Sequence, residues 1–478
     1  MSHRDKDCRN GSGTHAQEVI TAVDGLLAKV DLASIVFRTD CGWSVRGLVM
    51  AAMVWAWSSG TTLSGRFDQA LRIAGGLGKS FAPKKTSYQA FIKLLVRWTS
   101  PLRDRLVAAF QSLMECNFSR QFRLAGFIVL AGDGSKLKLA RTQSNEDRYS
   151  PNTRGKKGKK QRKANRARRR PRSRKAQIQQ ARNKKSDSPQ MALTLLYHVV
   201  LRLPWDWRLG PSTVSEREHL REMIPHLPPD ALVTADCGFF GYEFWSELLA
   251  NGRHFVIRVG GNVRLLKNLG VVRASHGTIY LWPDKVAKRG QPPLVLRLLQ
   301  VHDGRQPWYL VTSVRNPKRL SDRQLADIYR RRWRIELFFR HFKQTFGRAK
   351  LRSHKAEHAE CEAQWSLLGL WAMLLHAQIE HQSEYGEAGN ISVVRVLNAF
   401  RQAIDEPACR SEKGKTLTDQ ILAAVVDSYI RRNKTSRNYP RKKYEPPTKP
   451  PQIADATRLQ RQLAQELTSR PIRKGLTA

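Results

Sequence analysis

Apolar positions in the first quarter of the chain recur with the periodicity of helices. Between residues 14 and 118 the apolar side chains fall largely on one side of successive helical turns. The segments that carry this pattern are Glu18–Val30, Val45–Trp57, Ser64–Ala74 and Ser87–Trp98. Glycines and a proline between residues 75 and 83 interrupt the pattern. We therefore expect a helical N-terminal region.

From about residue 125 the pattern changes to short, continuous apolar runs, which are typical of buried strands. The expected strands are Phe127–Ala131, Met191–Val200, Trp205–Leu209, Ala231–Ala235 and His254–Val259. Two helical segments, Glu216–Pro225 and Tyr242–Ala250, lie between them. The alternation of strands with helices predicts an α/β layer.

Residues 260–312 break this rhythm, because the short runs Gly277–Leu281 and Leu294–Val301 predict further β structure, and Trp308–Thr312 reads as another strand. A long helix is then expected from Ser321, where SDRQ forms a capping box, to Phe346, with Gly347 ending it. The remaining chain is predicted to be helical to about residue 430. A proline-rich basic segment, Tyr439–Pro451, and one more helix follow.

The charge of the chain narrows the range of partners. The chain has 84 Lys and Arg against 40 Asp and Glu, a formal net charge of +44 at pH 7. Such self-repulsion favours a polyanionic partner, and nucleic acid is the usual one because each neutralised phosphate releases counterions. On charge alone, an anionic membrane surface or an architectural role remains open. The stretch Thr86–Trp98, which starts with capping residues and carries cations, is either a recognition helix or an ordinary amphipathic helix.

Residues 154–185 form a separate feature, with seventeen Lys and Arg and no acidic residue. This block cannot build a core and lies between two expected strands, so it is predicted to be a loop insertion. Non-specific phosphate binding is the favoured interpretation. A solvated loop or a localisation signal is the alternative.

Other sequence features exclude some classes of protein. The six cysteines contain no CxxC pair, which argues against a zinc finger and a disulfide framework and fits a reducing cytosol. The start of the chain is polar, and the apolar stretches Val45–Trp57 and Leu367–Leu375 are too short to cross a bilayer. We expect a cytoplasmic, nucleoid-associated protein without a membrane partner.

The long helix carries the most specific local pattern, Y-x2-R-x3-E-x6-K. At about 100° per residue its four members, Tyr329, Arg332, Glu336 and Lys343, share an arc of roughly 60° beside an apolar, mostly aromatic face. A carboxylate flanked by cations suits a scissile phosphate, since the acid holds a metal ion and the cations hold flanking phosphates. A surface stripe of helical ion pairs is the alternative.

Asp133 and Asp236 each follow a short apolar run, and the ends of such strands are where ligands bind in open α/β sheets. Either residue alone could be a turn or capping aspartate. Together with Glu336 they form a D…D…E set, which phosphoryl transfer by two Mg²⁺ ions, or by Mn²⁺ in their place, requires. The three residues are the candidate catalytic and metal-binding set.

With these motifs in place, the chain resembles a DDE transposase of the insertion-sequence-four type, the family that includes the transposon-five enzyme. The matching segments are AGDGS around Asp133, TADCGF around Asp236 and YRRRWRIELFFRHFK around Glu336. The resemblance spans about residues 120–375. It implies an α/β ribonuclease H-like catalytic core with a β-rich insertion, flanked by helical N- and C-terminal regions. The implied parts are an N-terminal DNA-binding region at 1–118, a catalytic domain at 119–375 with insertions at 154–185 and 260–312, and a C-terminal region at 376–478 that would serve dimerisation.

The resemblance also implies roles for single residues. Tyr329, Arg332 and Lys343 would contact DNA phosphates near the cleaved end. A Trp on the last strand of the insertion would stack on a flipped base, and Trp308 stands in the matching place, 28 residues before Glu336. A core Trp is the alternative there, and Trp282 is a weaker candidate. The basic run 154–185 is longer than the family pattern leads us to expect.

The implied reaction is transposition by a homodimer on double-stranded DNA. The protein would bind inverted repeats, cut one strand, form a hairpin through the freed 3′-OH, and join the ends to target DNA. Tyr329 would position DNA, not attack it. A metal-dependent nuclease and an inactive, DNA-binding former transposase are the rival interpretations.

Overall fold

The fold is taken from a computed structural model of the whole chain. It describes residues 14–38, 40–75, 83, 86–150, 188–273, 275, 277–302, 307–406, 415–426 and 449–469. The predicted basic insertion at 154–185 and most of the segment Tyr439–Pro451 lie outside the described residues.

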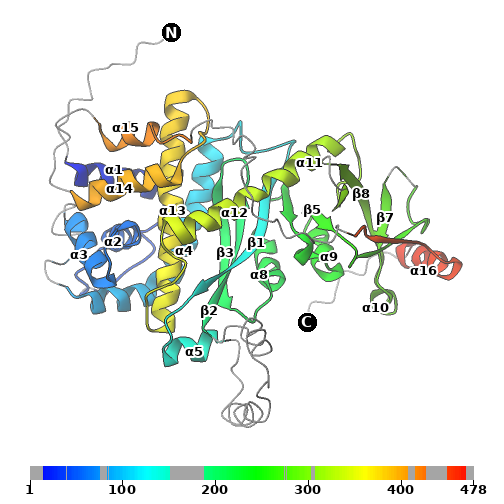
Figure 1. Cartoon of the computed structure of the whole chain (residues 1–478), viewed down its shortest axis with the longest axis horizontal. Coiled ribbons are helices and arrows are strands. Elements are labelled where there is room, and N and C mark those ends of the chain that lie inside the picture. Colours follow the sequence, from blue (N-terminus) through cyan, green and yellow to red (C-terminus); the bar gives the residue numbers. More distant parts are fainter. Residues whose placement is uncertain are drawn as a thin grey trace, which may run out of the picture.

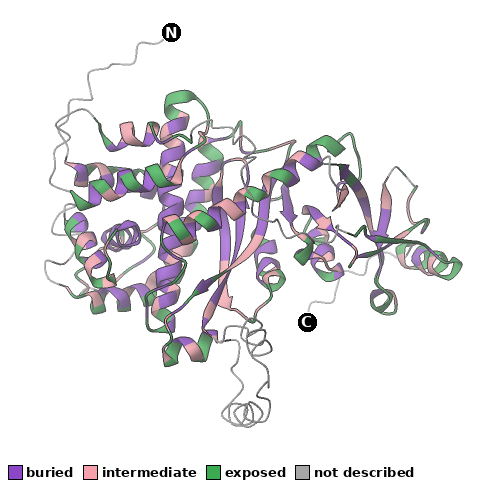
Figure 2. Ribbon diagram, viewed as in Figure 1, coloured by how far each residue is buried: buried purple, intermediate pink, exposed green. Residues whose placement is uncertain are grey.

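A helical body occupies one end of the molecule (Figure 1). Its N-terminal helices are α1 (His15–Leu27), α2 (Val45–Trp57), α3 (Leu63–Gly75) and α4 (Tyr88–Asn117). The C-terminal helices α13 (Ala356–Tyr385), α14 (Val393–Asp405) and α15 (Leu417–Leu422) pack directly against them. Segments from opposite ends of the sequence therefore share one apolar core, seen as the buried interior in Figure 2.

Helix α4 is much longer than the sequence predicts, because it continues past Trp98 and through Pro101 to Asn117. Proline removes one backbone donor and would favour ending the helix there. The buried residues beyond it, such as Leu102 and Phe110, pack into the core and outweigh that penalty. The apolar face of the predicted recognition segment Thr86–Trp98 lies in the same core.

A ten-stranded mixed sheet runs from the helical body to the other end of the molecule, in the order β10-β6-β7-β8-β9-β5-β4-β1-β2-β3. The first strands along the chain are β1 (Ile128–Lys138), β2 (Gln190–His198), β3 (Leu203–Pro211), β4 (Ala231–Ala235) and β5 (His254–Val259). Strand β1 pairs antiparallel with β2 and parallel with β4, and β5 runs parallel to β4. The prediction of an α/β layer is confirmed.

The β structure predicted within 260–312 extends this sheet. It consists of β6 (Arg264–Lys267), β7 (Thr278–Leu281), β8 (Leu294–His302) and β9 (Pro307–Thr312), and β9 pairs antiparallel with β5. The sequence did not predict β6, nor the C-terminal strand β10 (Gln452–Asp455) that pairs with it. Helix α16 (Arg458–Ser469) follows β10 and confirms the predicted last helix.

Several shorter helices connect the strands. They are α5 (Gln143–Tyr149), α8 (Glu216–Met223), η2 (Ile224–His226), η3 (Cys237–Phe239), α9 (Tyr242–Ala250) and α10 (Asp284–Ala287).

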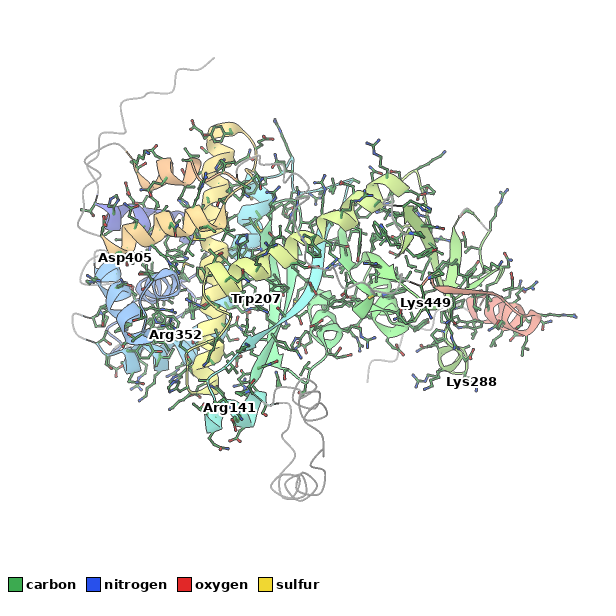
Figure 3. All side chains as sticks on the ribbon, in the orientation of Figure 1. Arg141, Trp207, Lys288, Arg352, Asp405 and Lys449 are labelled. Carbon is green, nitrogen blue, oxygen red and sulfur yellow. The ribbon has the colours of Figure 1, made fainter. Side chains whose placement is uncertain are left out.

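Trp207 of β3 joins the sheet to the helical body (Figure 3). Its indole Nε1 donates to Gln364 Oε1 at 2.7 Å, and its ring meets that of Trp371 edge-on.

The prediction of one continuous helix from Ser321 to Phe346 is wrong. The structure has α11 (Asp322–Arg331), α12 (Trp333–Arg340) and a π-helical turn, η4 (His341–Thr345). The predicted capping box of Ser321 and Gln324 is present, and Gly347 ends the run with a φ of 75°. The joint at Arg332 arises because its amide bonds the carbonyl of Tyr329, one residue nearer than in an α-helix.

Within the described part of the chain, no helix has the length and apolar character that crossing a membrane requires.

Candidate active site

Asp133 lies in the middle of β1, not just past a strand as the sequence suggested. The strand continues because its polar second half, up to Lys138, still pairs with β2. On its other edge the pairing with β4 ends at Gly132 opposite Ala235, so Asp133 is the first residue beyond that parallel ladder. Its Oδ1 accepts a hydrogen bond from the amide of Gly134 at 2.8 Å.

Asp236 directly follows β4, as predicted, and caps η3 by accepting a hydrogen bond from the amide of Gly238 at 2.8 Å. The parallel register of β1 and β4 places Asp133 and Asp236 at the same level of the sheet. The negative charge of Asp236 acts on Asp133. The two aspartates therefore form one acidic edge.

Glu336 reaches this edge through Arg332. The Arg332 guanidinium bonds Glu336 Oε1 at 2.9 Å and lies 3.7 Å from Asp133 Oδ2. Arg332 also lies over the ring of Tyr329, 5.6 Å from its centroid, and its Nε is buried without a hydrogen-bond partner. A cation thus bridges two of the three predicted carboxylates.

The electrostatics of this edge are unfavourable for a carboxylate. Burial raises the pKa of Asp133 to about 6, opposed by the Gly134 amide and Arg332 and increased further by the charges of Asp236 and Glu216. A raised acid pKa means that the ionised form destabilises the fold at pH values above it. This penalty is relieved as the pH falls from about 6 towards the ordinary value of 3.8.

We expect Asp133→Asn to stabilise the protein at pH 7, by on the order of 1 kcal/mol, because it removes an ionised carboxylate from a site that disfavours charge. Thermal unfolding of both proteins at pH 7 and pH 4 measures the effect. The advantage should disappear at pH 4, where Asp133 is protonated in the folded parent. A less stable variant at pH 7 contradicts the prediction.

Tyr329 and Trp308 form an aromatic pair beside the acidic edge, with ring centroids 5.2 Å apart. Trp308 lies on β9 and is partly exposed, whereas Tyr329 is buried, which raises its pKa. The weaker candidate Trp282 is only 4% exposed and donates its indole N–H to the carbonyl of Gln291 at 2.8 Å. Trp282 is therefore part of the core of the insertion.

Lys343 also reaches the site, from the π-helical turn η4. Its ammonium group donates to Ser135 Oγ at 2.5 Å, and burial lowers its pKa. Ser135 alternates with Asp133 along β1, so both side chains point to the same face of the sheet. The residues of the Y-R-E-K pattern thus lie along strands β1 and β9. Tyr329 packs on β9, and Arg332 and Lys343 contact β1. Glu336 is held next to them by Arg332.

Sequence reasoning missed two residues near this site. Trp333 follows Arg332 on the same helical run and is 57% exposed, which is unusual for so large an apolar side chain. Its position next to the Y-R-E-K arc was available from the helical periodicity. Glu216, at the start of α8, acts electrostatically on Asp133, and only the tertiary structure brings it there.

The donor set suits a hard divalent cation, because carboxylate oxygens are the ligands that Mg²⁺ prefers. Arg332 already shows that positive charge is favoured between Asp133 and Glu336. Among the residues that the structure describes, however, no three acidic, imidazole or thiol groups lie close enough to hold a metal ion together. The chemistry of the residues fits such an ion.

Comparison with known proteins finds similar chains. The chain shares 29% identity over 198 residues with the "Transposase InsG for insertion sequence element IS4" of Escherichia coli (strain K12). That alignment covers 39% of this chain and 42% of the relative, less than half of its length. A solved structure described as "Cryo-EM structure of piggyBac transposase synaptic complex with hairpin DNA" aligns with 89% of this chain and 88% of its own, at 11% identity and a TM-score of 0.39. So low a score carries no weight for fold or function.

The sequence profile of the family described as "Transposase DDE domain" matches residues 127–372, more than half of the chain. The matched region contains Asp133, Asp236 and Glu336. The predicted family is confirmed: the chain belongs to the Transposase DDE domain family.

Proposed function

We propose that this chain is the transposase of an insertion sequence. It binds the terminal inverted repeats of the element, cuts DNA there by metal-dependent phosphoryl transfer through a hairpin, and joins the 3′ ends to target DNA. The observation that carries this proposal is the arrangement of Asp133 and Glu336 around Arg332, with Asp236 acting on Asp133 from the neighbouring strand end. The similarity to InsG, a transposase for an insertion sequence element, supports it.

We propose that each region of the chain has the function that the resemblance implies for it. Residues 119–375 form a ribonuclease H-like catalytic domain, which is supported by an antiparallel β1–β2–β3 unit that continues through the parallel strands β4 and β5. Residues 1–118 bind the DNA ends, and residues 376–478 serve dimerisation. Because α1, α2 and α4 share a core with α13 and α14, DNA binding, catalysis and pairing would be mechanically linked.

We propose that the cationic side chains of the site bind DNA phosphates. In the structure Arg332 is held by Asp133 and Glu336, both acids. A DNA phosphate offers the guanidinium two oxygens in the geometry that it prefers. Arg332 would then turn from the carboxylates to the phosphate, and Lys343 would leave Ser135 for a neighbouring phosphate. Tyr329 would position the strand.

The carboxylates left by Arg332 would hold divalent cations, two Mg²⁺ ions or Mn²⁺ in their place. When bound, such ions polarise the scissile phosphate and make a hydroxyl group a stronger nucleophile. No nucleophilic side chain is required, so we propose direct attack by water and then by the 3′-OH. The partners are double-stranded DNA and a second copy of the chain.

The rivals are a nuclease that cuts without joining and a DNA-binding former transposase. A direct test is incubation of the purified chain with Mg²⁺ and DNA that carries the inverted repeats flanking its gene. A transposase produces hairpin ends and strand-transfer products. Linear products without joining favour the nuclease, and binding without cleavage favours the former transposase.

We predict that Trp308→Ala nicks DNA at the parental rate but forms hairpins about tenfold less, because a stacked base contributes roughly 1–3 kcal/mol. Gel analysis of nicked and hairpin products measures the two steps separately. Trp308→Phe keeps an aromatic face and should retain most of the hairpin yield. Equal hairpin yields in Trp308→Ala and the parent would show that Trp308 only packs against Tyr329.

A further inference from the structure

Three arginines gather on the side of α12 that faces away from the catalytic acids. Arg334 and Glu336 lie two residues apart on α12, about 200° around the helix, so their side chains point to opposite sides. Arg334 reaches the turn between β2 and β3, where its Nη1 donates to the carbonyl of Val199 at 2.6 Å. Arg202 of the same turn and Arg331 of α11 act electrostatically on Arg334. We call these three side chains the arginine cluster.

The arginine cluster holds more positive charge than its surroundings neutralise. All three side chains are half-buried. Burial lowers the pKa of Arg334 to about 10, and the charges of Arg202 and Arg331 lower it further. Burial, together with Arg331, also lowers the pKa of Arg202. Asp327, the acid that acts on Arg334, is already paired with Arg331 at 2.9 Å. Three cations therefore share one carboxylate.

The backbone at Arg202 is a second, independent observation. Its φ is 59°, in the left-handed region that favours glycine and disfavours a side chain with a Cβ atom. The turn holds this conformation through the Arg202 amide, which donates to the carbonyl of His198 at 2.9 Å. The guanidinium has no hydrogen bond or ion pair with the residues that the structure describes. Local structure thus gives no reason for an arginine here, and strain of this kind is typical of functional positions.

We propose that the arginine cluster binds a backbone phosphate of DNA, on the opposite side of α12 from the catalytic acids. The inference rests on the proposed function, since it takes DNA as the partner. Phosphate oxygens match the donors of a guanidinium, and their charge would relieve the repulsion between Arg202 and Arg334. This phosphate is not the reacting one, because α12 lies between it and Glu336. The contact positions the duplex and carries no sequence information.

The test is a titration of the full chain against two labelled duplexes, followed by fluorescence anisotropy without divalent ions at several KCl concentrations. One duplex carries the flanking repeats and the other has an unrelated sequence. We expect Arg202→Gln to weaken binding of both duplexes about fivefold near physiological salt. The slope of log affinity against log salt should fall by about one, as for one lost phosphate contact. Arg202→Lys keeps the charge and should retain most of that slope.

Arg221→Gln is the matched control, because it removes the same charge from the other face of the sheet. Arg221 lies on α8 and is paired with Glu247 at 2.6 Å. Cβ atoms on Gly132 and Gly134 would point at this helix, whereas Asp133, between them on β1, points to the opposite face. The control should keep the parental slope. An equal fall in its slope would assign the effect to net charge and overturn the cluster.

Arg202→Gly separates a binding role from a structural one. Glycine adopts the φ of this position without strain, so the thermal midpoint should not fall, whereas affinity and slope should fall as in Arg202→Gln. A lower midpoint with a parental slope would make Arg202 a structural residue of the turn.

The two duplexes distinguish failure of this inference from failure of the proposed function. A parental slope in a folded Arg202→Gln overturns the phosphate contact, while preference of the parent for the repeats still supports the proposed function. A loss confined to the repeat duplex assigns Arg202 to base recognition and also overturns the phosphate contact. Equal binding of both duplexes by the parent contradicts repeat recognition, and the slope of Arg202→Gln on the unrelated duplex then decides the cluster. A parent that binds neither duplex overturns both.

Discussion

Glu336→Gln should bind DNA ends as well as the parent and fail to cut them. The substitution keeps the shape of the side chain but removes the negative charge that Arg332 contacts at 2.9 Å and that a divalent ion would require. Loss of one such group from a preorganised site slows phosphoryl transfer by on the order of 10³-fold or more. DNA binding should persist because the cations Arg332 and Lys343 remain.

The measurement pairs a gel-shift titration with a single-turnover cleavage assay in Mg²⁺ on DNA carrying the flanking repeats. Asp327→Asn is the matched control, because this acid lies on the adjoining helix α11, is 49% exposed and pairs with Arg331. An exposed i,i+4 pair contributes little, so this variant should cut normally. Parental cleavage by Glu336→Gln would remove Glu336 from the catalytic set.

Arg348→Ala should destabilise the fold by about 3–5 kcal/mol, a large fraction of the stability of a typical domain. Arg348 follows the helix-ending Gly347 and is only 2% exposed. Its guanidinium donates to Ser366 Oγ of α13 at 2.7 Å and to the carbonyls of Ala56 and Phe346 at 2.7 and 3.0 Å. Burial lowers its pKa to about 9, so the group is still charged at pH 7.

Truncation to alanine leaves these acceptors buried without donors and opens a cavity where α2, α13 and the end of the site helix meet. Denaturant unfolding measures the loss. Arg352→Ala is the control, since that side chain is exposed, and it should change stability by less than about 0.5 kcal/mol. Arg348→Met keeps most of the side-chain volume but has no hydrogen-bond donors. Comparison with Arg348→Ala therefore separates the loss of the hydrogen bonds from the cost of the cavity. Parental stability of Arg348→Ala would show that its hydrogen bonds are dispensable.

The sequence predicted elements well where local signals coincide. Strand β4, helix α9 and strand β5 have the predicted bounds, because short apolar runs are flanked there by Pro, Gly and Asp. Strand β1 was predicted too short, since the polar residues after Asp133 look like a turn until β2 pairs with them. Strands β6 and β10 were missed because each is stabilised by a partner about 190 residues away along the chain.

The helical run that carries Glu336 was predicted from the sequence only in part. Its capping box, its end at Gly347 and the shared face of Tyr329, Arg332 and Glu336 follow from local periodicity. Local periodicity does not predict the joint at Arg332. It also does not predict the π-helical turn that brings Lys343 to Ser135. Periodicity assumes an ideal helix, whereas packing of the aromatic face on β1 and β2 sets the real path.

The sequence by itself determined that this is a basic α/β protein of a DDE transposase family, and it predicted Asp133, Asp236 and Glu336 as the catalytic acids. Charge, periodicity and motif spacing are properties of the chain alone, so no coordinates were needed for them. Only the tertiary structure decided that Arg332 bridges two of these acids and that Arg202 lies beside Arg334. Those contacts depend on strand order and on helices that are distant along the chain, which local residue patterns do not encode.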